Sequence, residues 1–234
     1  MPEISRRLQQ VYKEISLYEQ EFARPAGSVQ LLAVSKTRPS EDLLIAWQQG
    51  QKMFGENYLQ EASDKIAALQ GHAIEWHFIG PIQSNKTRAI AEQFDWVHSV
   101  DRLKTAQRLS QQRPANKPPL QVLIQVNSSG EASKSGCRFD ELDSLAKSIS
   151  QLPALNLRGL MTLPVTSTEF EQQRQPFGQL RLAMETLNQQ AYGLDTLSMG
   201  MSNDMRAAIA EGATLVRVGT AIFGERSPHL SPTR

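Results

Sequence analysis

Lys36 is the residue whose type and position most directly suggest chemistry. It follows the apolar run LLAVS at 31–35, so its amine leaves the end of a buried segment. Loss of hydration disfavours the charged ammonium, and the larger neutral fraction can attack a carbonyl carbon to form a Schiff base. A lysine here can also extend to solvent or pair with Glu56. Taken alone, the residue leaves both interpretations open.

Two loops near the C-terminus have the composition of a phosphate site. The segments SMGMSND at 198–204 and VGTAIFG at 218–224 each lead into a short helical stretch. Gly219 allows the backbone to approach an anion closely, while Ser202 and Thr220 supply hydroxyl donors. Either loop alone could be an ordinary turn with a helix cap. Because two such loops follow consecutive strands, a phosphate-binding site is the favoured interpretation over two ordinary turns.

Arg217 is unusual because it lies inside LVRV at 215–218, a segment that is otherwise apolar. A buried guanidinium without a partner is costly, so the residue needs either a core carboxylate or a bound ligand. The sequence leaves these two options open.

The remaining candidates carry weaker signals. His77 lies between Trp76 and Phe78, which is typical of a core histidine. Lys134 is expected to be a solvated loop residue, although a second amine could receive a transferred aldehyde. Cys137 is expected to have no chemical role. Three other histidines show no metal-ligand spacing: His72, His98 and His229.

Eight short apolar runs alternate with helical segments and must position these residues. The alternation indicates parallel strands joined by right-handed crossovers, and eight repeats favour a closed (β/α)8 TIM-type barrel over an open sheet. We expect one domain over 1–234, with an extra amphipathic helix at 2–22 covering the wall near the last strand. A Gln-rich helix over about 167–190 is expected to be kinked or divided at Pro176 and Gly178. The predicted strands are 29–34, 52–54, 74–79, 96–98, 120–126, 157–163, 196–199 and 215–218.

In such a barrel the carboxyl ends of the strands, here called the mouth, gather the functional groups. The reactive lysine, the phosphate loops and the arginine would therefore meet there. Their shared ligand is a phosphorylated aldehyde, with pyridoxal 5'-phosphate as the obvious candidate.

Composition excludes several classes of protein. The 234 residues carry 25 Lys+Arg and 24 Asp+Glu, so a net charge of +1 gives no field for nucleic acid or an anionic membrane. No apolar run is long enough to span a bilayer, and the charged N-terminus lacks the apolar centre of a signal peptide. One cysteine cannot form an internal disulfide. We expect a cytoplasmic protein.

Seven sequence blocks resemble the pyridoxal phosphate homeostasis proteins, whose barrel is similar to the N-terminal domain of fold type III enzymes such as alanine racemase. The blocks are LLAVSKT at 31–37, FGENY at 54–58, WHFIGPIQSNK at 76–86, SKSG at 133–136, RGLM at 158–161, LSMGMSNDM at 197–205 and VRVGTAIFG at 216–224.

The resemblance implies a role for seven residues and no metal. The aldimine lysine is Lys36, the phosphate is held by Ser202, Gly219 and Thr220 with Met201 lining the loop, Arg217 faces the pyridine nitrogen, and Asn57 lies beside the ring.

A cation beside the ring nitrogen disfavours the pyridinium and weakens the cofactor as an electron sink. Racemisation also needs a second acid/base, which the racemases take from a further domain that this chain length does not accommodate. We therefore expect a monomeric carrier without catalytic turnover that stores pyridoxal phosphate or delivers it to apo-enzymes, affecting amino- and keto-acid balance. The alternatives are an amino-acid racemase or related fold type III enzyme, and a phosphosugar enzyme with Lys36 as an aldolase-type lysine.

Overall fold

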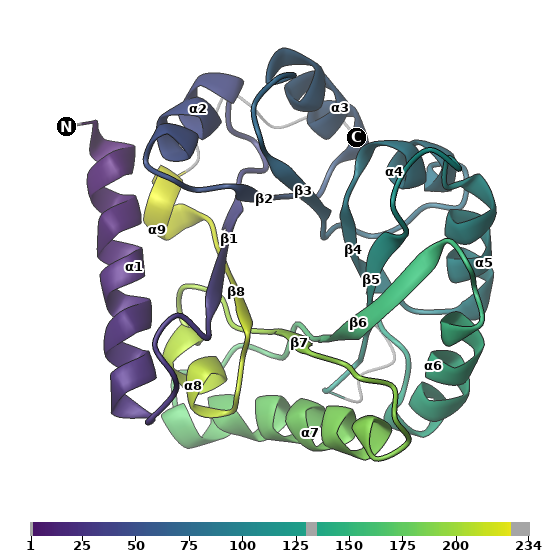
Figure 1. The fold of residues 1–234 in the computed structure, drawn as a ribbon. Helices are drawn as coiled ribbons and strands as arrows, with labels where there is room; N and C mark the ends of the chain where they lie inside the picture. The colour runs from purple at the N-terminus through teal and green to yellow at the C-terminus, as the bar shows by residue number, and fades with distance from the viewer. Residues whose placement is uncertain (1, 130–134, 226–234) are drawn as a thin grey trace.

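A computed structural model describes residues 2–129 and 135–225 and contains a closed barrel of parallel strands (Figure 1). Each strand pairs with the next in chain order, and β8 closes the barrel by pairing with β1. This confirms the predicted (β/α)8 architecture. The strands are β1 (Gln30–Val34), β2 (Met53–Glu56), β3 (Glu75–Phe78), β4 (Trp96–Val100), β5 (Leu120–Gln125), β6 (Leu155–Met161), β7 (Thr196–Ser198) and β8 (Leu215–Val218).

Helices follow the strands and cover the outside of the barrel (Figure 1). The main hydrophobic core lies between the sheet and these helices. The helices are α2 (Ser40–Gln48), α3 (Leu59–Ala68), α4 (Thr87–Gln93), α5 (Leu103–Gln112), α6 (Leu142–Ser150) after the short 3-10 turn η1 (Phe139–Glu141), α7 (Phe170–Asn188), α8 (Met205–Ala210) and α9 (Thr220–Phe223).

The extra helix α1 (Glu3–Glu21) precedes the first strand and packs against α2, α8 and α9. Its buried residues include Leu8, Val11 and Ile15, whose three- and four-residue spacing forms one apolar stripe. The α8 and α9 segments are short, so α1 covers the wall around β1 and β8 (Figure 1). This is the position that the sequence predicts.

Helix α7 runs continuously from Phe170 to Asn188, so a division at Pro176 and Gly178 is the part of the prediction that is wrong. A proline inside a helix removes one backbone hydrogen bond and clashes with the preceding turn. Packing offsets this cost, since Phe170 before the proline and Phe177 after it both contact the core.

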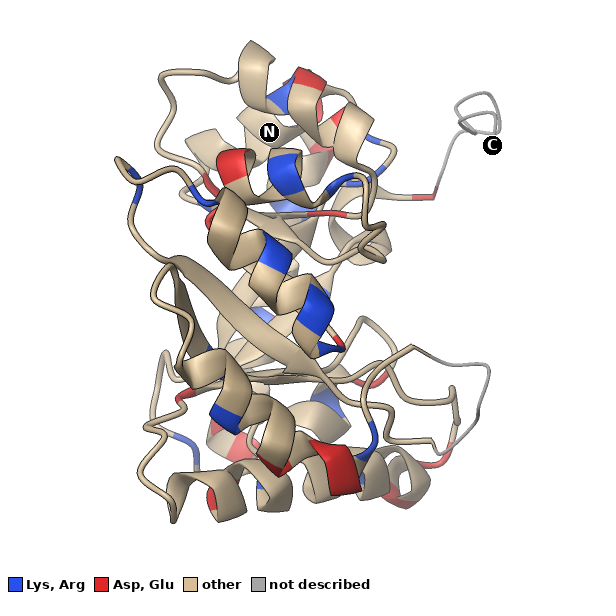
Figure 2. Ribbon diagram, turned by 90° about the vertical axis from the view of Figure 1, so that its right-hand side faces the viewer, with Lys and Arg blue, Asp and Glu red and all other residues tan. Residues whose placement is uncertain are grey.

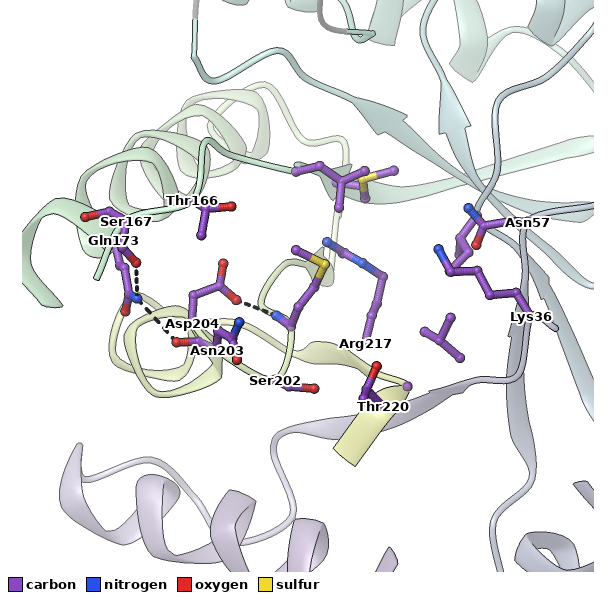
Figure 3. Close-up of a pocket in the computed structure, with 16 residues that line it drawn as sticks. Lys36, Asn57, Thr166, Ser167, Gln173, Ser202, Asn203, Asp204, Arg217 and Thr220 are labelled. Atoms are coloured by element: carbon purple, nitrogen blue, oxygen red, sulfur yellow. Dashed lines mark hydrogen bonds between the residues drawn. The ribbon is translucent and has the colours of Figure 1, made fainter. Parts of the chain in front are cut away.

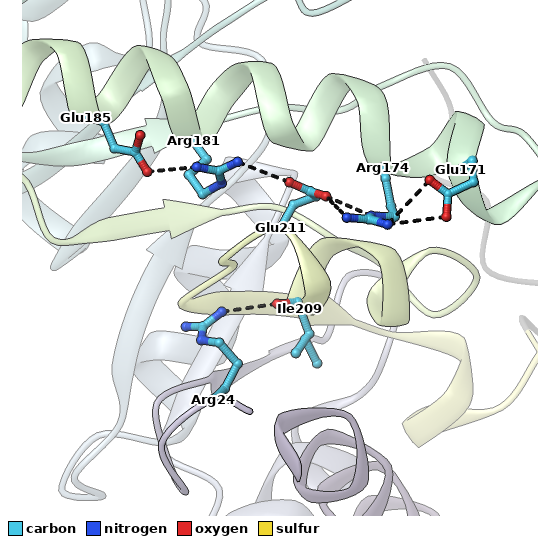
Figure 4. Close-up of polar contacts among 7 residues, drawn as sticks. All are labelled: Arg24, Glu171, Arg174, Arg181, Glu185, Ile209 and Glu211. Carbon is cyan, nitrogen blue, oxygen red and sulfur yellow. Dashed lines mark hydrogen bonds and ion pairs between the residues drawn. The ribbon is translucent and has the colours of Figure 1, made fainter. Parts of the chain in front are cut away.

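Ion pairs join α7 to the end of α8 (Figure 4). The nearly buried carboxylate of Glu211 accepts a 2.7 Å hydrogen bond from Arg174 Nε and a 3.5 Å contact from Arg181 Nη2. On the other side, Arg24 Nη1 donates to the carbonyl oxygen of Ile209 at 3.1 Å. The helix that follows the 198–204 loop is therefore held from two directions.

The interior of the barrel combines apolar and polar side chains. Trp96, Leu123 and Met161 form a small cluster separate from the main core. His77 is fully buried and stacks on Trp96 with ring centroids 5.3 Å apart, so it is an interior histidine, as predicted. His98 is equally buried beside it.

Positive and negative side chains are interspersed over the helices rather than segregated (Figure 2). Among the described residues, no helix combines the length and apolarity needed to cross a membrane. Over 2–129 and 135–225, no group of three or more His, Cys, Asp or Glu side chains is arranged to hold a metal ion.

Candidate functional site

A cavity of about 420 Å³ opens at the mouth of the barrel (Figure 3). Side chains and backbone from the ends of β1, β2, β7 and β8 line it. The structure brings all seven residues of the predicted site to this one cavity: Lys36, Asn57, Met201, Ser202, Arg217, Gly219 and Thr220.

A buried ionic cluster fixes the residue before Lys36. Ser35 Oγ donates to Glu56 Oε1 at 2.6 Å, and Lys65 Nζ donates to the same oxygen at 2.7 Å. Lys65 also donates to the carbonyl oxygen of Ser35 at 2.7 Å. The cation at Glu56 is therefore Lys65, from helix α3. Sequence analysis does not single out Lys65, because a lysine on a helix is ordinarily exposed.

The residue after Lys36 is fixed by the same cluster. Thr37 has a φ of 64°, a region that costs a β-branched residue roughly 1–3 kcal/mol. Its backbone N–H donates to Glu61 Oε1 at 2.5 Å, and that oxygen pairs with Lys65 at 2.6 Å. Both neighbours of Lys36 thus have set positions, so its side chain leaves the wall toward the cavity in a defined direction (Figure 3).

Burial makes Glu56 an unusual acid. Desolvation raises the pKa of this carboxyl to about 7, although the Lys65 charge and the hydrogen bonds from Lys65 and Ser35 act in the opposite direction. Its second oxygen, Oε2, has no hydrogen-bond partner within the described part of the chain.

Asn57 follows Glu56 and lines the cavity next to Lys36 (Figure 3). Its Oδ1 is buried and accepts no hydrogen bond from any described residue. The backbone of Gly80 packs directly against Asn57, because a Cβ at Gly80 would lie 2.1 Å from the Asn57 carbonyl oxygen. A buried amide oxygen that faces a cavity is a ready acceptor for a ligand hydroxyl.

Arg217 projects from β8 into the cavity and is almost fully buried. Nη1 donates to Ser198 Oγ at 2.6 Å and Nη2 donates to the carbonyl oxygen of Thr162 at 2.8 Å. Burial lowers its pKa to about 10, partly offset by the charge of Asp204. The hydrogen-bond partners are neutral oxygens rather than the core carboxylate that the sequence left as one option.

The two glycine-containing loops, for which the sequence predicts phosphate binding, lie beside Arg217 (Figure 3). We call residues 200–204 with Gly219 and Thr220 the phosphate corner after that prediction. Gly200 has a φ of 93°, and a Cβ there would lie 2.5 Å from the Ala208 side chain. The Met201 backbone N–H donates to Asp204 Oδ1 at 2.5 Å, which closes the first loop on itself. Burial raises the pKa of Asp204, the last residue of the SMGMSND loop.

Gln173 is a second residue that the sequence analysis missed. It comes from the Gln-rich helix α7, lines the cavity, and donates from Nε2 to the carbonyl oxygens of Ser167 at 2.7 Å and Asn203 at 3.3 Å (Figure 3). The amide thereby joins the loop after β6 to the phosphate corner. Only its position in the chain could have indicated this role, because Gln173 lies in the first helical turn after a βα loop.

Cys137 is 4% exposed, and burial raises its pKa to about 12, so it is not a reactive thiol. Lys134 lies outside the described residues.

Comparison with known proteins finds relatives that match nearly the whole chain. The family described as "Alanine racemase, N-terminal domain" matches residues 8–227. The pyridoxal phosphate homeostasis protein of Vibrio cholerae is 56% identical over 230 residues, covering 97% of this chain and 98% of that protein. The Escherichia coli K12 protein of the same name is 50% identical over 229 residues, covering 97% of this chain and 98% of that one. The chain belongs to the pyridoxal phosphate homeostasis family.

Two solved structures share the fold of this chain. PipY of Synechococcus elongatus, in a structure described as having PLP bound, is 37% identical with a TM-score of 0.82, covering 94% of this chain and all of PipY. Alanine racemase of Corynebacterium glutamicum has a TM-score of 0.69 at 17% identity, covering 96% of this chain and 64% of the racemase. The second likeness concerns the barrel fold alone.

Proposed function

We propose that this protein binds pyridoxal 5'-phosphate covalently through Lys36 and stores or delivers it in the cytoplasm, without catalytic turnover. The observation that carries the proposal is that Lys36, Arg217 and the phosphate corner open onto one cavity. Relatives at 50–56% identity named for pyridoxal phosphate homeostasis, and PipY with PLP bound, support it.

The residues present fit this cofactor. The unpartnered Oδ1 of Asn57 can accept a hydrogen bond from the ring hydroxyl. Hydroxyls and backbone amides at Ser202, Gly219 and Thr220 can hold the phosphate, with Met201 on the same loop. The cavity volume lies within the range of small-molecule sites.

Arg217 affects which reactions a bound cofactor could support. When bound, pyridoxal phosphate supplies an aldehyde carbon for the lysine amine and a ring that accepts electrons once its nitrogen is protonated. Arg217 keeps its charge at neutral pH and would disfavour that protonation. It thereby opposes carbanion chemistry of the transaminase kind, and an amino-acid racemase remains the alternative function.

Absorbance spectroscopy and mass spectrometry test the covalent claim. After borohydride reduction of the loaded protein, we expect a mass increase confined to the peptide that contains Lys36. Lys36→Ala should lose both the increase and the visible band, while Lys86→Ala, an exposed lysine in the loop before α4, should retain them. A visible band that survives in Lys36→Ala would overturn the proposal.

Exchange of the α-proton in deuterated water tests the absence of turnover. Loaded protein incubated with a panel of amino acids should show no sustained exchange or racemisation. A steady rate that depends on Lys36 would establish the racemase alternative instead.

Delivery is tested by mixing loaded protein with an apo-enzyme that needs pyridoxal phosphate, with and without a trap for free cofactor. Activation that persists with the trap indicates direct transfer, and activation that disappears indicates release into solution.

Sedimentation of the loaded protein tests the expectation that it is a monomer.

A further inference from the structure

A continuous chain of hydrogen bonds crosses the interior of the barrel from the mouth to the opposite end. Arg217 Nη1 contacts Ser198 Oγ at 2.6 Å, and Ser198 Oγ contacts His98 Nδ1 at 2.9 Å. His98 Nε2 contacts His77 Nδ1 at 2.9 Å, and His77 Nε2 contacts Glu75 Oε1 at 2.9 Å. Ser198, His98 and His77 have no solvent exposure, and we call these three residues the relay.

The chemistry of the two ends fixes the direction of every bond. The Glu75 carboxylate can only accept, so His77 donates from Nε2 and, as a neutral ring, accepts at Nδ1. His98 must then carry its proton on Nε2 and donate to His77 Nδ1. The neutral His98 ring then accepts from the Ser198 hydroxyl at Nδ1, and the Ser198 oxygen accepts from Arg217, because a guanidinium can only donate. Each group in the relay donates once and accepts once.

Burial keeps both imidazoles of the relay neutral. Burial places the pKa of His98 well below its usual value, and the neighbouring His77 and Arg217 charges act in the same direction. Burial also lowers the pKa of His77, against the effects of Glu75 and Asp95. A neutral imidazole is what the single donor and single acceptor of each ring require.

The far end of the relay is anchored at the amino ends of the strands. The hydrogen bond from His77 lowers the pKa of Glu75, with further contributions from Trp96 and Arg158, so the carboxylate stays charged. The guanidinium of Arg158 lies 4.9 Å from the Trp96 ring centroid and pairs with Asp195 at 2.6 Å. Glu75 is therefore a charged acceptor at one end of the barrel, as Arg217 is a charged donor at the other.

We infer that Ser198, His98 and His77 are positioning residues for Arg217, which hold its guanidinium toward the cavity and transmit the binding of a ligand at the mouth to the interior histidines. Ser198 and the Thr162 carbonyl occupy one N–H on each terminal nitrogen, so the remaining N–H groups are oriented for a ligand. A ring nitrogen that accepts from Arg217 would polarise the bonds along the relay, because linked hydrogen bonds strengthen one another. The identity of the ligand rests on the proposed function; the arrangement of the relay does not.

Nitrogen-15 NMR of histidine-labelled protein tests the relay directly. The chain has 4 histidines, so the signals can be assigned with single substitutions. Without ligand, His77 and His98 should both be neutral at neutral pH, with their protons on Nε2. A proton on Nδ1 of either ring, or a charged ring at neutral pH, would overturn the inference whatever the protein binds.

Ligand addition tests the transmission. Pyridoxal phosphate should shift the His98 nitrogens and, less strongly, those of His77, whereas inorganic phosphate, which lacks a ring, should leave both unchanged. Equal shifts with the two ligands would contradict the relay. Absence of covalent binding to Lys36 would instead contradict the proposed function and leave the tautomer result standing.

Substitution of Ser198 separates positioning from packing. Ser198→Ala should abolish the histidine shifts and weaken cofactor binding by about tenfold, while Ser198→Thr, which keeps the hydroxyl, should restore the shifts. The matched control is Ser99→Ala, which removes another buried strand hydroxyl, bonded to the Gly80 carbonyl oxygen, and should leave the shifts intact. Shifts that persist in a folded Ser198→Ala protein would refute transmission through this serine.

Discussion

Two polar networks support opposite sides of the same cavity, and they differ in charge. On the β1 and β2 side, Lys65 and two carboxylates hold the backbone around Lys36 from outside the sheet. On the β7 and β8 side, the relay of neutral groups holds Arg217 from inside the barrel. The first network compensates buried charge with opposite charge, and the second keeps its interior members uncharged.

The difference follows from the space available to each network. Between the sheet and a helix, a long side chain such as Lys65 can bring a charge to the buried Glu56 carboxylate. Inside the barrel, the guanidinium needs acceptors that do not cancel its charge, because a neighbouring carboxylate would neutralise the field toward a ligand. Neutral acceptors therefore leave Arg217 able to act on the cavity.

The largest loss of stability should come from removal of Lys65, the cation of the ionic network on the β1 and β2 side. Lys65→Met leaves two carboxylates without their shared partner, and breaking a buried pair in this way costs about 3–5 kcal/mol. Urea unfolding should show this loss, together with weaker cofactor binding because Ser35 and Thr37 lose their support. Lys104→Met, an exposed helix lysine, should change neither by more than about 0.5 kcal/mol.

Removal of the cation from the other side should affect the cofactor more than the fold. Arg217→Met leaves two buried oxygens without their donor, which costs about 1–3 kcal/mol of unfolding free energy. Without the positive charge, the pKa of the cofactor ring nitrogen should rise. Absorbance titration of the loaded variant should therefore show a protonation that the parent protein lacks, and an unchanged titration would contradict the position assigned to Arg217.

A break within the relay should cost no more than the loss of Arg217, and it should change the pH dependence of stability. His98 is neutral in the fold but takes up a proton in the unfolded chain below about pH 6.5, so it makes stability fall as the pH falls through that value. In His98→Phe this contribution disappears, and the free energy of unfolding at pH 8 falls by about 1–3 kcal/mol as Ser198 and His77 lose a partner. His98→Gln, which retains a donor and an acceptor, should lose less stability.

The smallest change in stability should come from substitution of Glu56. Its pH dependence should run opposite to that of His98. Its pKa is raised from 4.5 to about 7, so the folded protein holds a proton that the unfolded chain releases over that range. This group therefore makes stability fall as the pH rises from 4.5 to about 7. In Glu56→Gln this decline should be reduced, while Lys65 retains Glu61 as its partner. Parallel pH curves for the variant and its parent would show that the buried proton is absent.

The sequence was sufficient to predict the barrel and the placement of the seven residues at its mouth. Alternating apolar runs and helices specify parallel strands, whose ends converge on one face. A residue that directly follows a strand, such as Lys36 or Asn57, is therefore located without any side-chain geometry. The continuity of α7 was not predictable in this way, because tertiary packing outweighs the local cost of Pro176.

The supporting networks could not be derived from the same pattern. Strands buried on both faces read as continuous apolar runs, so the pattern does not distinguish an interior position from one under a helix. His98 and Ser198 are 100 residues apart in the chain. They meet only because the strands close into a barrel in one particular register. Lys65 and Gln173 come from helices whose charged or polar composition predicts exposure rather than a structural role.

The relay also has a consequence for how the chain folds. Its bonds join β3 and β4, formed early in the sequence, to β7 and β8 at the end of the barrel. A sheet that stopped short of closure would leave the buried histidines, serine and guanidinium without partners, at a cost of about 1–3 kcal/mol for each unsatisfied group. Partly closed barrels are therefore penalised, and the polar interior makes closure of the fold a cooperative, all-or-none event.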